Sequence, residues 1–109
     1  MYKLQETAEA QKDLDNLAAY MIFSLKNGKA AMNFLISYHK QLQNLLTFPF
    51  AYRSVNFIYQ RHEIRMKTFS SYNIFFIIDT SNHQITILRV LKDRQNWKSI
   101  LKIEDKYSS

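Results

Sequence analysis

Seven side chains in the second half of the chain could together perform acid–base chemistry on a phosphodiester. Cleavage of RNA without a metal needs a base for the attacking 2′-hydroxyl, cations for the charged transition state and an acid for the leaving oxygen. His62 or Glu63 could act as the acid or base, and the arginines and lysines could bind the phosphate. The candidate residues are His62, Glu63, Arg65, Lys67, Arg89, Lys92 and Arg94.

A predicted strand beginning at about His62 would place part of this set on one surface. Polar and apolar residues alternate there, so Glu63, Arg65 and Lys67 share one strand face and apolar residues share the other. Arg89 could join the polar face from a neighbouring strand if the register allows. The alternative is an ordinary solvated strand face, whose ion pairs contribute less than about 1 kcal/mol each.

Arg89 interrupts an apolar face of another predicted strand. Alternation places Ile85 and Ile87 on the face of Arg89 and places Val90 on the opposite face. A cation on an apolar face needs a partner or an aqueous groove. Arg89 therefore either lines a functional groove or pairs with Glu63 and stabilises the sheet. On the first interpretation, we expect Arg89→Ala to weaken activity without unfolding the protein.

Other kinds of chemistry have little support in the sequence. A single glycine excludes a Gly-rich phosphate loop, and the absence of cysteine excludes a thiol nucleophile and disulfides. His39 and His83 are predicted at the surface, and their spacing fits no metal motif. Trp97 is expected to anchor the last helix in the core. We therefore expect no metal and no cofactor.

The first half of the chain predicts a strand followed by two helices. Alternation over Tyr2–Gln5 indicates a short strand, and Thr7 can cap the first helix. A break at Asn27-Gly28, typical of a left-handed helix stop, separates the two helices, and Pro49 ends the second. Each helix has an apolar stripe, formed by Leu14, Leu17, Ala18, Met21, Ile22 and Leu25 in the first and by Ala31, Phe34, Leu35, Tyr38, Leu42 and Leu45 in the second.

The second half predicts antiparallel strands and a short final helix. Tyr72–Ile78 is apolar on both faces, which is typical of a central strand, and Asp79–His83 has the composition of a hairpin loop. Asp93 can cap a helix that ends the domain. The segment Phe50–Arg61 is compatible with either a loop or an edge strand. The apolar side of the final helix is Trp97, Ile100 and Leu101.

This order of elements predicts an α+β fold. We expect an N-terminal strand, a long antiparallel helical hairpin packed on one face of a curved antiparallel sheet, and a short C-terminal helix, because amphipathic helices joined by a short turn pack antiparallel. The opposite sheet face would then be the working surface. A chain of 109 residues with 47% hydrophobic content is the size of one domain, so we expect a single domain over residues 1–109.

The charge of the chain indicates the kind of partner it meets. A formal net charge of +6 favours encounters with nucleic acids or with an acidic protein, although such a charge also maintains solubility. The amino-terminal residues lack the apolar stretch of a signal peptide, and no run reaches the roughly 18 apolar residues of a membrane span. We expect a cytoplasmic protein that does not associate with membranes.

Several segments resemble the RelE/ParE family of toxins from bacterial toxin–antitoxin pairs. The most specific is residues 85–97, ITILRVLKDRQNW, which is similar to the closing strand and basic tail of that family. The resemblance extends from about Lys3 to Leu101. It implies a growth-inhibiting toxin of the kind associated with plasmid stabilization, neutralised by a cognate acidic antitoxin. The other matching segments are Ala8–Tyr20, Phe48-Pro49, Glu63–Arg65 and Ser71–Phe76.

Two departures from the family pattern bear on the target. Asn73 stands where family members usually have arginine, and Phe76 stands where many have tyrosine. In the ribosome-dependent ribonucleases of this superfamily, basic groups on these strands hold the scissile phosphate and assist proton transfer. Asn73 therefore weakens a nuclease interpretation. The long helical hairpin is more similar to the ParE branch, whose members block DNA gyrase.

Three functions stay open on the sequence alone. The favoured one is a toxin that inhibits DNA gyrase through its hairpin and basic tail without catalysis, with target or antitoxin contacts at Arg65, Lys67, Arg89, Lys92 and Arg94. The alternative is a ribosome-dependent mRNA endonuclease that binds phosphate through Arg65, Lys67, Arg89 and Arg94, with His62 or Glu63 as acid or base. The third is a non-toxic nucleic-acid-binding module. An adjacent reading frame encoding a short acidic protein would favour either toxin.

Overall fold

A five-stranded sheet forms the centre of the protein in the computed structural model, which describes residues 2–103 and side chains through Leu101. The strand order is β1-β5-β4-β3-β2, and β1 runs parallel to β5 while the other pairs are antiparallel. The sheet is therefore mixed, not purely antiparallel as predicted. The strands are β1 (Lys3–Glu6), β2 (Ser54–Tyr59), β3 (His62–Phe69), β4 (Tyr72–Asp79) and β5 (Gln84–Lys92).

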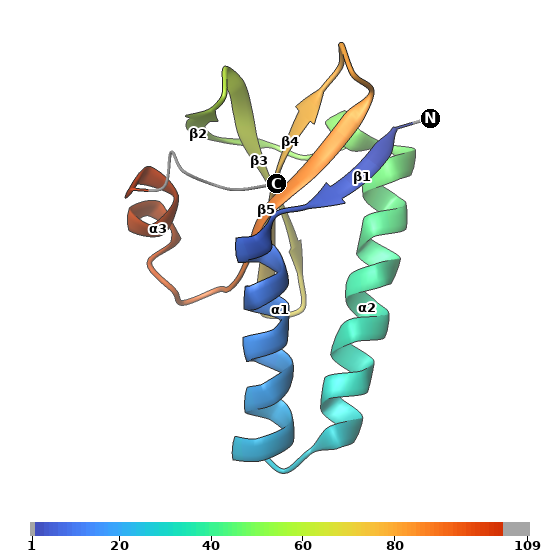
Figure 1. The fold of residues 1–109 in the computed structure, drawn as a ribbon, viewed down its shortest axis with the longest axis vertical. Coiled ribbons are helices and arrows are strands. Elements are labelled where there is room, and N and C mark those ends of the chain that lie inside the picture. Colours follow the sequence, from blue (N-terminus) through green and yellow to red (C-terminus); the bar gives the residue numbers. More distant parts are fainter. Residues whose placement is uncertain (1, 104–109) are drawn as a thin grey trace.

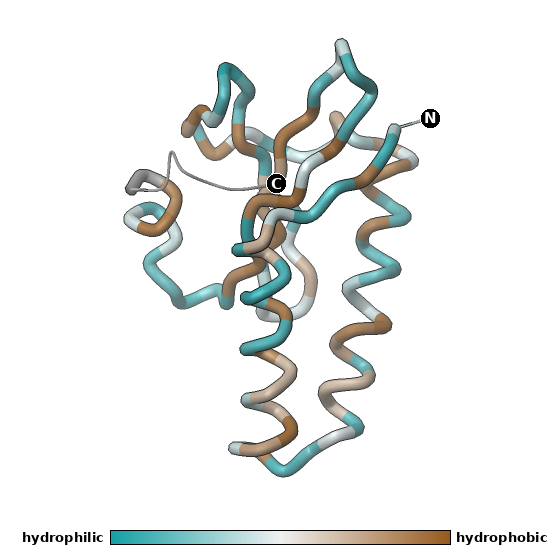
Figure 2. The backbone as a smooth tube through the Cα atoms, in the orientation of Figure 1, coloured by the Kyte–Doolittle hydropathy of each residue, from teal (hydrophilic) through white to brown (hydrophobic). Residues whose placement is uncertain are grey.

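Two long helices form the predicted antiparallel hairpin. Helix α1 (Ala8–Ala19) continues into a single π-helical segment, η1 (Tyr20–Ser24), and α2 (Gly28–Thr47) returns beside it and ends in a short 3₁₀ turn, η2 (Pro49–Ala51). The hairpin projects well past the strands (Figure 1). Its apolar residues continue along both helices toward the projecting end (Figure 2). The α+β fold is thus confirmed, and the ambiguous segment contains edge strand β2.

The helix ends show which capping predictions were correct. The fully buried Thr7 accepts a hydrogen bond from the Ala10 N–H at 3.0 Å, so it caps α1 as predicted. The prediction that Asn27-Gly28 forms a left-handed helix stop was wrong. The left-handed residue is Lys26, with φ of 51°, whereas Asn27 caps α2 by accepting from the Ala30 N–H. The Asn-Gly pair begins the second helix because the asparagine side chain satisfies a free amide there.

Apolar clusters cover both faces of the sheet. The cluster on the hairpin side joins α1 and α2 to alternate residues of β4 and β5. The cluster on the opposite side lies beneath α3 (Trp97–Ile103), where the Trp97 ring is 5.3 Å from the Phe75 ring, so Trp97 is the core anchor that was predicted. Central strand β4 is consequently buried on both faces. The sheet face predicted as an open working surface is instead partly packed against α3, because this helix contributes Leu101 to that core.

An irregularity in β5 overturns one predicted alternation. Phe76 pairs with Ile87 whereas the adjacent Phe75 pairs with Arg89, so one extra residue is accommodated in β5. Val90 therefore packs in the hairpin-side core with Ile87, on the face opposite to the predicted one. A bulge inserts a residue and shifts the two-residue period beyond it, which periodicity alone does not reveal.

A partly buried hydrogen bond joins the hairpin to β1. The Tyr38 hydroxyl, from α2, donates to the Glu6 carboxylate, and the tyrosine is only 1% exposed. Burial, together with this hydrogen bond, raises the pKa of Tyr38 far above its usual value. The protonated hydroxyl is therefore favoured in the folded state. Its contribution to stability is fully present below the unfolded pKa of about 10 and is lost as the pH rises through the higher folded pKa.

We expect Tyr38→Phe to lower the free energy of unfolding by roughly 1.5–3 kcal/mol at neutral pH, because a hydrogen bond to a charged group is lost. Above pH of about 10, the wild type should lose stability faster than Tyr38→Phe, so the difference between them narrows. Urea unfolding at several pH values measures both effects, with Tyr20→Phe at the exposed Tyr20 as control. A constant difference from neutral to strongly alkaline pH would contradict the linkage.

Candidate functional site

The structure places the candidate catalytic residues at separate positions. His62 lies at the start of β3. Lys92 of β5 pairs with Tyr72 of β4, and Tyr72 pairs with Phe69 at the opposite end of β3. Seven residues of strand span about 23 Å. His62 and the basic residues at the end of β5 are therefore too far apart to act on one phosphodiester, and they do not form the shared site that the nuclease interpretation needs.

Arg65 and Lys67 lie on the hairpin side of β3, level with Phe76 and Ile74. Arg65 donates to the Tyr52 carbonyl at 2.7 Å. Its guanidinium also lies 5.3 Å from the centre of the Phe50 ring and 3.7 Å from the Glu63 carboxylate. The predicted shared face of Glu63 and Arg65 is thus occupied by a salt bridge and by the segment after α2.

Lys67 has a similar aromatic neighbour. Its ammonium lies 5.0 Å from the centre of the Tyr52 ring, and burial lowers the pKa of Lys67. The Tyr52 ring in turn packs edge-on against Phe76 in the sheet. Lys67 and Arg65 therefore both contact the segment after α2, so each has a packing contact in the folded protein.

His62 has an acidic neighbour across the sheet. Its Nε2 atom is 3.9 Å from the Asp79 carboxylate, and its buried Nδ1 atom has no hydrogen-bond partner among the described residues. Hydrogen bonds from the Asn82 side chain and backbone lower the pKa of Asp79. The pair sits beside the β4–β5 loop, away from the basic end of β5.

Arg89 is the candidate whose surroundings differ most from the prediction. Its Nε and Nη2 atoms bind the two carboxylate oxygens of Asp13 at 2.7 and 2.8 Å, and both side chains are largely buried. The same carboxylate accepts from the Val90 N–H at 3.0 Å. The acidic partner is thus Asp13 of α1, and the suggested pairing with Glu63 is corrected. Asp13 thus accepts a backbone hydrogen bond from β5 beyond the point where β1 has ended. No local pattern in the sequence reveals a contact across 76 residues.

Lys92 and Arg94 are exposed at the end of β5. They line a notch of about 420 Å³ with Ser71, Tyr72 and Asp93, which we call the basic notch. The Lys92 ammonium also lies 4.7 Å from the centre of the Tyr20 ring on the hairpin. Of the predicted contact residues, these two are the ones that the structure leaves available to a partner on this surface.

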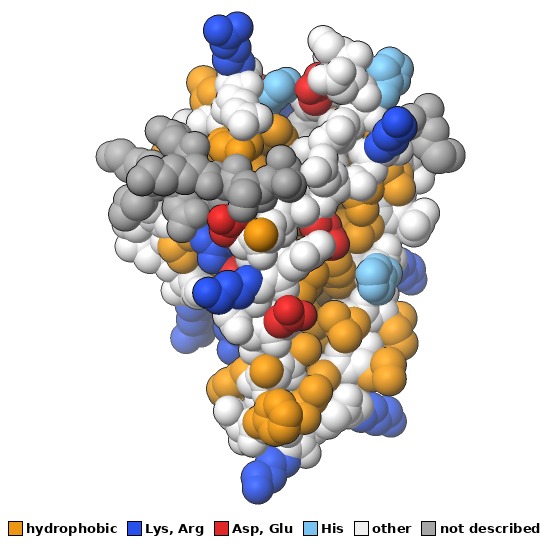
Figure 3. All heavy atoms as spheres, viewed as in Figure 1, with side chains coloured by type: hydrophobic (Ala, Val, Ile, Leu, Met, Phe, Trp, Pro, Cys, Tyr) orange, Lys and Arg blue, Asp and Glu red, His pale blue; other side chains and the backbone are white. Residues whose placement is uncertain are grey.

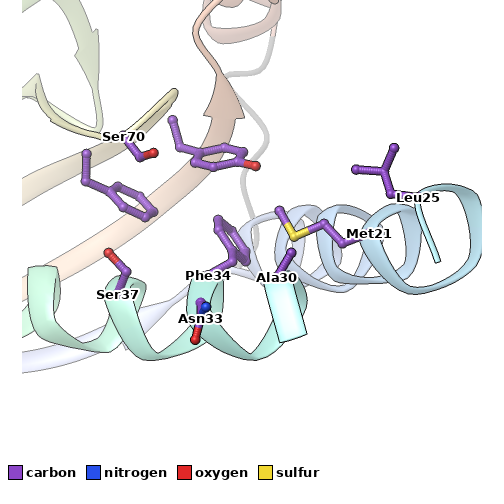
Figure 4. Close-up of a pocket in the computed structure, with 9 residues that line it drawn as sticks. Met21, Leu25, Ala30, Asn33, Phe34, Ser37 and Ser70 are labelled. Carbon is purple, nitrogen blue, oxygen red and sulfur yellow. The ribbon is translucent and has the colours of Figure 1, made fainter. Parts of the chain in front are cut away.

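A neighbouring cleft was not anticipated. It has a volume of about 470 Å³ and lies between the hairpin helices and the β3–β4 turn. Figure 4 shows Phe34 and Ser37 of α2 facing Ser70 of the turn, with Met21 and Leu25 extending the wall along the other helix. Tyr72 lines both this cleft and the basic notch. The wall residues are Met21, Leu25, Ala30, Asn33, Phe34, Ser37, Phe69, Ser70 and Tyr72.

The projecting half of the hairpin exposes large apolar side chains. Phe23 is 74% exposed and Met32 is 62% exposed, and apolar atoms are visible at the hairpin end in Figure 3. Exposed apolar residues concentrated in one region are typical of protein-binding surfaces. The first stripe was predicted to be buried, but its end extends beyond the sheet that would cover it. We call this set the hairpin-end residues: Tyr20, Ile22, Phe23, Leu25, Met32 and Ile36.

Comparison with protein families decides the membership of the chain. The family model described as "ParE toxin of type II toxin-antitoxin system, parDE" matches residues 4–97. The chain belongs to this ParE toxin family. It is therefore the toxin type of a type II toxin–antitoxin system, a class that has an antitoxin partner. No curated protein sequence matches the chain.

Two further observations on this ParE-family chain concern other kinds of site. Within residues 2–103, no helix is both long and apolar enough to cross a membrane. The same described part of the chain contains no group of three or more histidine, cysteine or acidic side chains that could hold a metal ion.

Proposed function

We propose that this ParE-family toxin inhibits DNA gyrase through protein–protein contacts and performs no catalysis of its own. The main support is the distribution of the candidate catalytic residues. Arg65, Lys67 and Arg89 are engaged by aromatic rings or by Asp13, and His62 is far from Lys92. A nuclease must instead aim several preorganised donors at one phosphate.

The loss of rate expected from one missing transition-state donor supports this choice over a ribosome-dependent mRNA endonuclease. Loss of one transition-state donor commonly costs about 3–4 kcal/mol, or a factor of roughly 100 to 1000 in rate. Asn73 is a neutral residue engaged with Thr68 and Asp93, so it offers no cation at the position where the nucleases have arginine. A supercoiling assay with purified gyrase, run beside a ribosome assay, tests the proposal.

The proposed gyrase contact combines the hairpin-end residues with Lys92 and Arg94. Interfaces commonly join a buried aromatic or apolar centre to a polar rim that fixes orientation. Phe23 offers such an anchor, and Lys92 reaches the hairpin through its contact with Tyr20. Because gyrase is a cytoplasmic enzyme, we propose that the toxin acts in the cytoplasm, where pairing with an antitoxin would serve plasmid stabilization.

The proposed antitoxin site is the apolar cleft beside the basic notch. An acidic segment that is disordered when free could place apolar side chains in the cleft and a carboxylate near Lys92 or Arg94, and order on binding. The net charge of +6 favours such a partner. Calorimetry against the product of the adjacent reading frame should detect binding at moderate salt, whereas no heat of binding would reject this part of the proposal.

A further inference from the structure

Asn73 is a buried polar residue within the most apolar strand of the sheet. It is 3% exposed and is followed along β4 by the fully buried Ile74 and Phe75. Its side-chain oxygen accepts from the Thr68 hydroxyl at 2.8 Å, and its side-chain nitrogen donates to the Asp93 carboxylate at 3.1 Å. The Asn73 amide carries both a hydrogen-bond donor and an acceptor, and in a buried position each of them needs a partner. Thr68 and Asp93 supply these two partners.

The Asp93 end of this chain of hydrogen bonds belongs to the basic turn, which we define as residues 92–95. The Asp93 N–H also donates to the Ser71 carbonyl at 2.8 Å. Within the turn, the Lys92 N–H donates to the Gln95 side chain, and the Gln95 N–H donates back to the Lys92 carbonyl. The turn is therefore closed by its own hydrogen bonds. Lys92 attaches it to β4 by pairing with Tyr72, and beyond that pair Asp93 attaches it to β4 and to the β3–β4 turn.

We propose that Asn73 is a positioning residue, which holds Asp93 just beyond the end of β5 and thereby fixes Arg94 beside Lys92 at the surface that contacts the toxin's partner. This inference rests on the proposed role of Lys92 and Arg94. Exposed cations on long side chains contribute to a contact only when their backbone is held in place, because ordering a free segment costs conformational entropy. The residue that departs from the family pattern thus acts through the basic turn, without touching a partner itself.

The two ends of the hydrogen bond can be exchanged without changing the shape of the side chains. Asn73→Asp alone places a carboxylate against Asp93, which replaces attraction with repulsion in a partly buried setting. Adding Asp93→Asn restores a donor opposite an acceptor, and the Thr68 hydroxyl can still donate to an aspartate at position 73. Asp93→Asn alone retains an acceptor for the Asn73 amide, so it should keep the exchange protection of the N–H at position 93.

The test compares Asn73→Asp, Asp93→Asn and the double exchange by amide hydrogen exchange and by growth inhibition in cells at matched soluble toxin levels. We expect Asn73→Asp to lose the exchange protection of the Asp93 N–H and to inhibit growth about tenfold less, whereas the double exchange should recover both properties. Asn16→Asp, at an exposed asparagine of α1, is the matched control and should leave both unchanged. If Asn73→Asp does not fold, recovery of both properties in the double exchange still supports the proposal.

Two results would overturn the inference. Retained protection at Asp93 in Asn73→Asp would show that Asn73 does not hold the turn, and lost protection with full growth inhibition would show that the turn needs no positioning. A double exchange that folds but does not recover growth inhibition counts against it equally. Growth inhibition does not depend on which target is correct, so failure of the gyrase proposal would appear separately, in the supercoiling assay of the wild type.

Discussion

Arg89→Ala should lower the free energy of unfolding by about 2–3 kcal/mol, because it leaves the largely buried Asp13 carboxylate without its cation. Asp13 would still accept from the Val90 N–H, which limits the loss. The geometry therefore revises the earlier expectation of lost activity in an intact fold. Any loss of growth inhibition should follow the loss of folded protein.

Urea unfolding followed by circular dichroism measures the effect of Arg89→Ala. The matched control is Arg94→Ala, which removes an exposed arginine and should change stability by less than about 0.5 kcal/mol. Asp13→Asn is informative as well, because it removes the charge but keeps an acceptor for the Val90 N–H. If Arg89→Ala were as stable as the wild type but no longer inhibited growth, Arg89 would be a contact residue and not a structural one.

Leu25→Asp should weaken antitoxin binding by on the order of 10- to 100-fold, the usual cost of losing an apolar anchor at an interface. Leu25 lines the cleft yet is 55% exposed, so the change alters the binding wall at little cost to folding. The introduced carboxylate would also repel an acidic segment. Calorimetry against the purified antitoxin measures the dissociation constant.

Ile58→Asp provides the matched control for this experiment. Ile58 is 66% exposed on edge strand β2, so the same charge is added at an apolar position that is at least as exposed as Leu25 and does not line the cleft. Its antitoxin affinity should stay within about twofold of the wild type. Equal weakening by both variants would show that general charge, and not the cleft, governs the affinity.

Elements with strong local signals were predictable from the sequence. The apolar stripe of α2, the Thr7 cap and the two-sided burial of β4 all follow from residues close together in the chain, and the structure has each of them. The parallel pairing of β1 with β5 was missed, because it joins residues about 80 positions apart. The cap of α3 was also misplaced. Asp93 binds Asn73, and the Asn96 side chain instead accepts from the Ser99 N–H.

The candidate site was less predictable than the fold. Alternation correctly placed Glu63 and Arg65 together, but it could not reveal the aromatic segment after α2 that engages Arg65. It also could not reveal the bulge in β5 or the long-range ion pair between Arg89 and Asp13. Such contacts depend on tertiary packing, for which single-strand periodicity has no signal.

The most direct test of a non-catalytic gyrase inhibitor is a paired assay of the purified toxin. Added to gyrase, relaxed plasmid and ATP, the toxin should block supercoiling in proportion to its concentration, and prior addition of the antitoxin should restore it. Added to programmed ribosomes, the same preparation should leave the messenger RNA intact, because His62 lies far from the basic residues at the end of β5 and they do not meet at one phosphate. Codon-positioned cleavage of the messenger RNA with unimpaired gyrase would contradict this account.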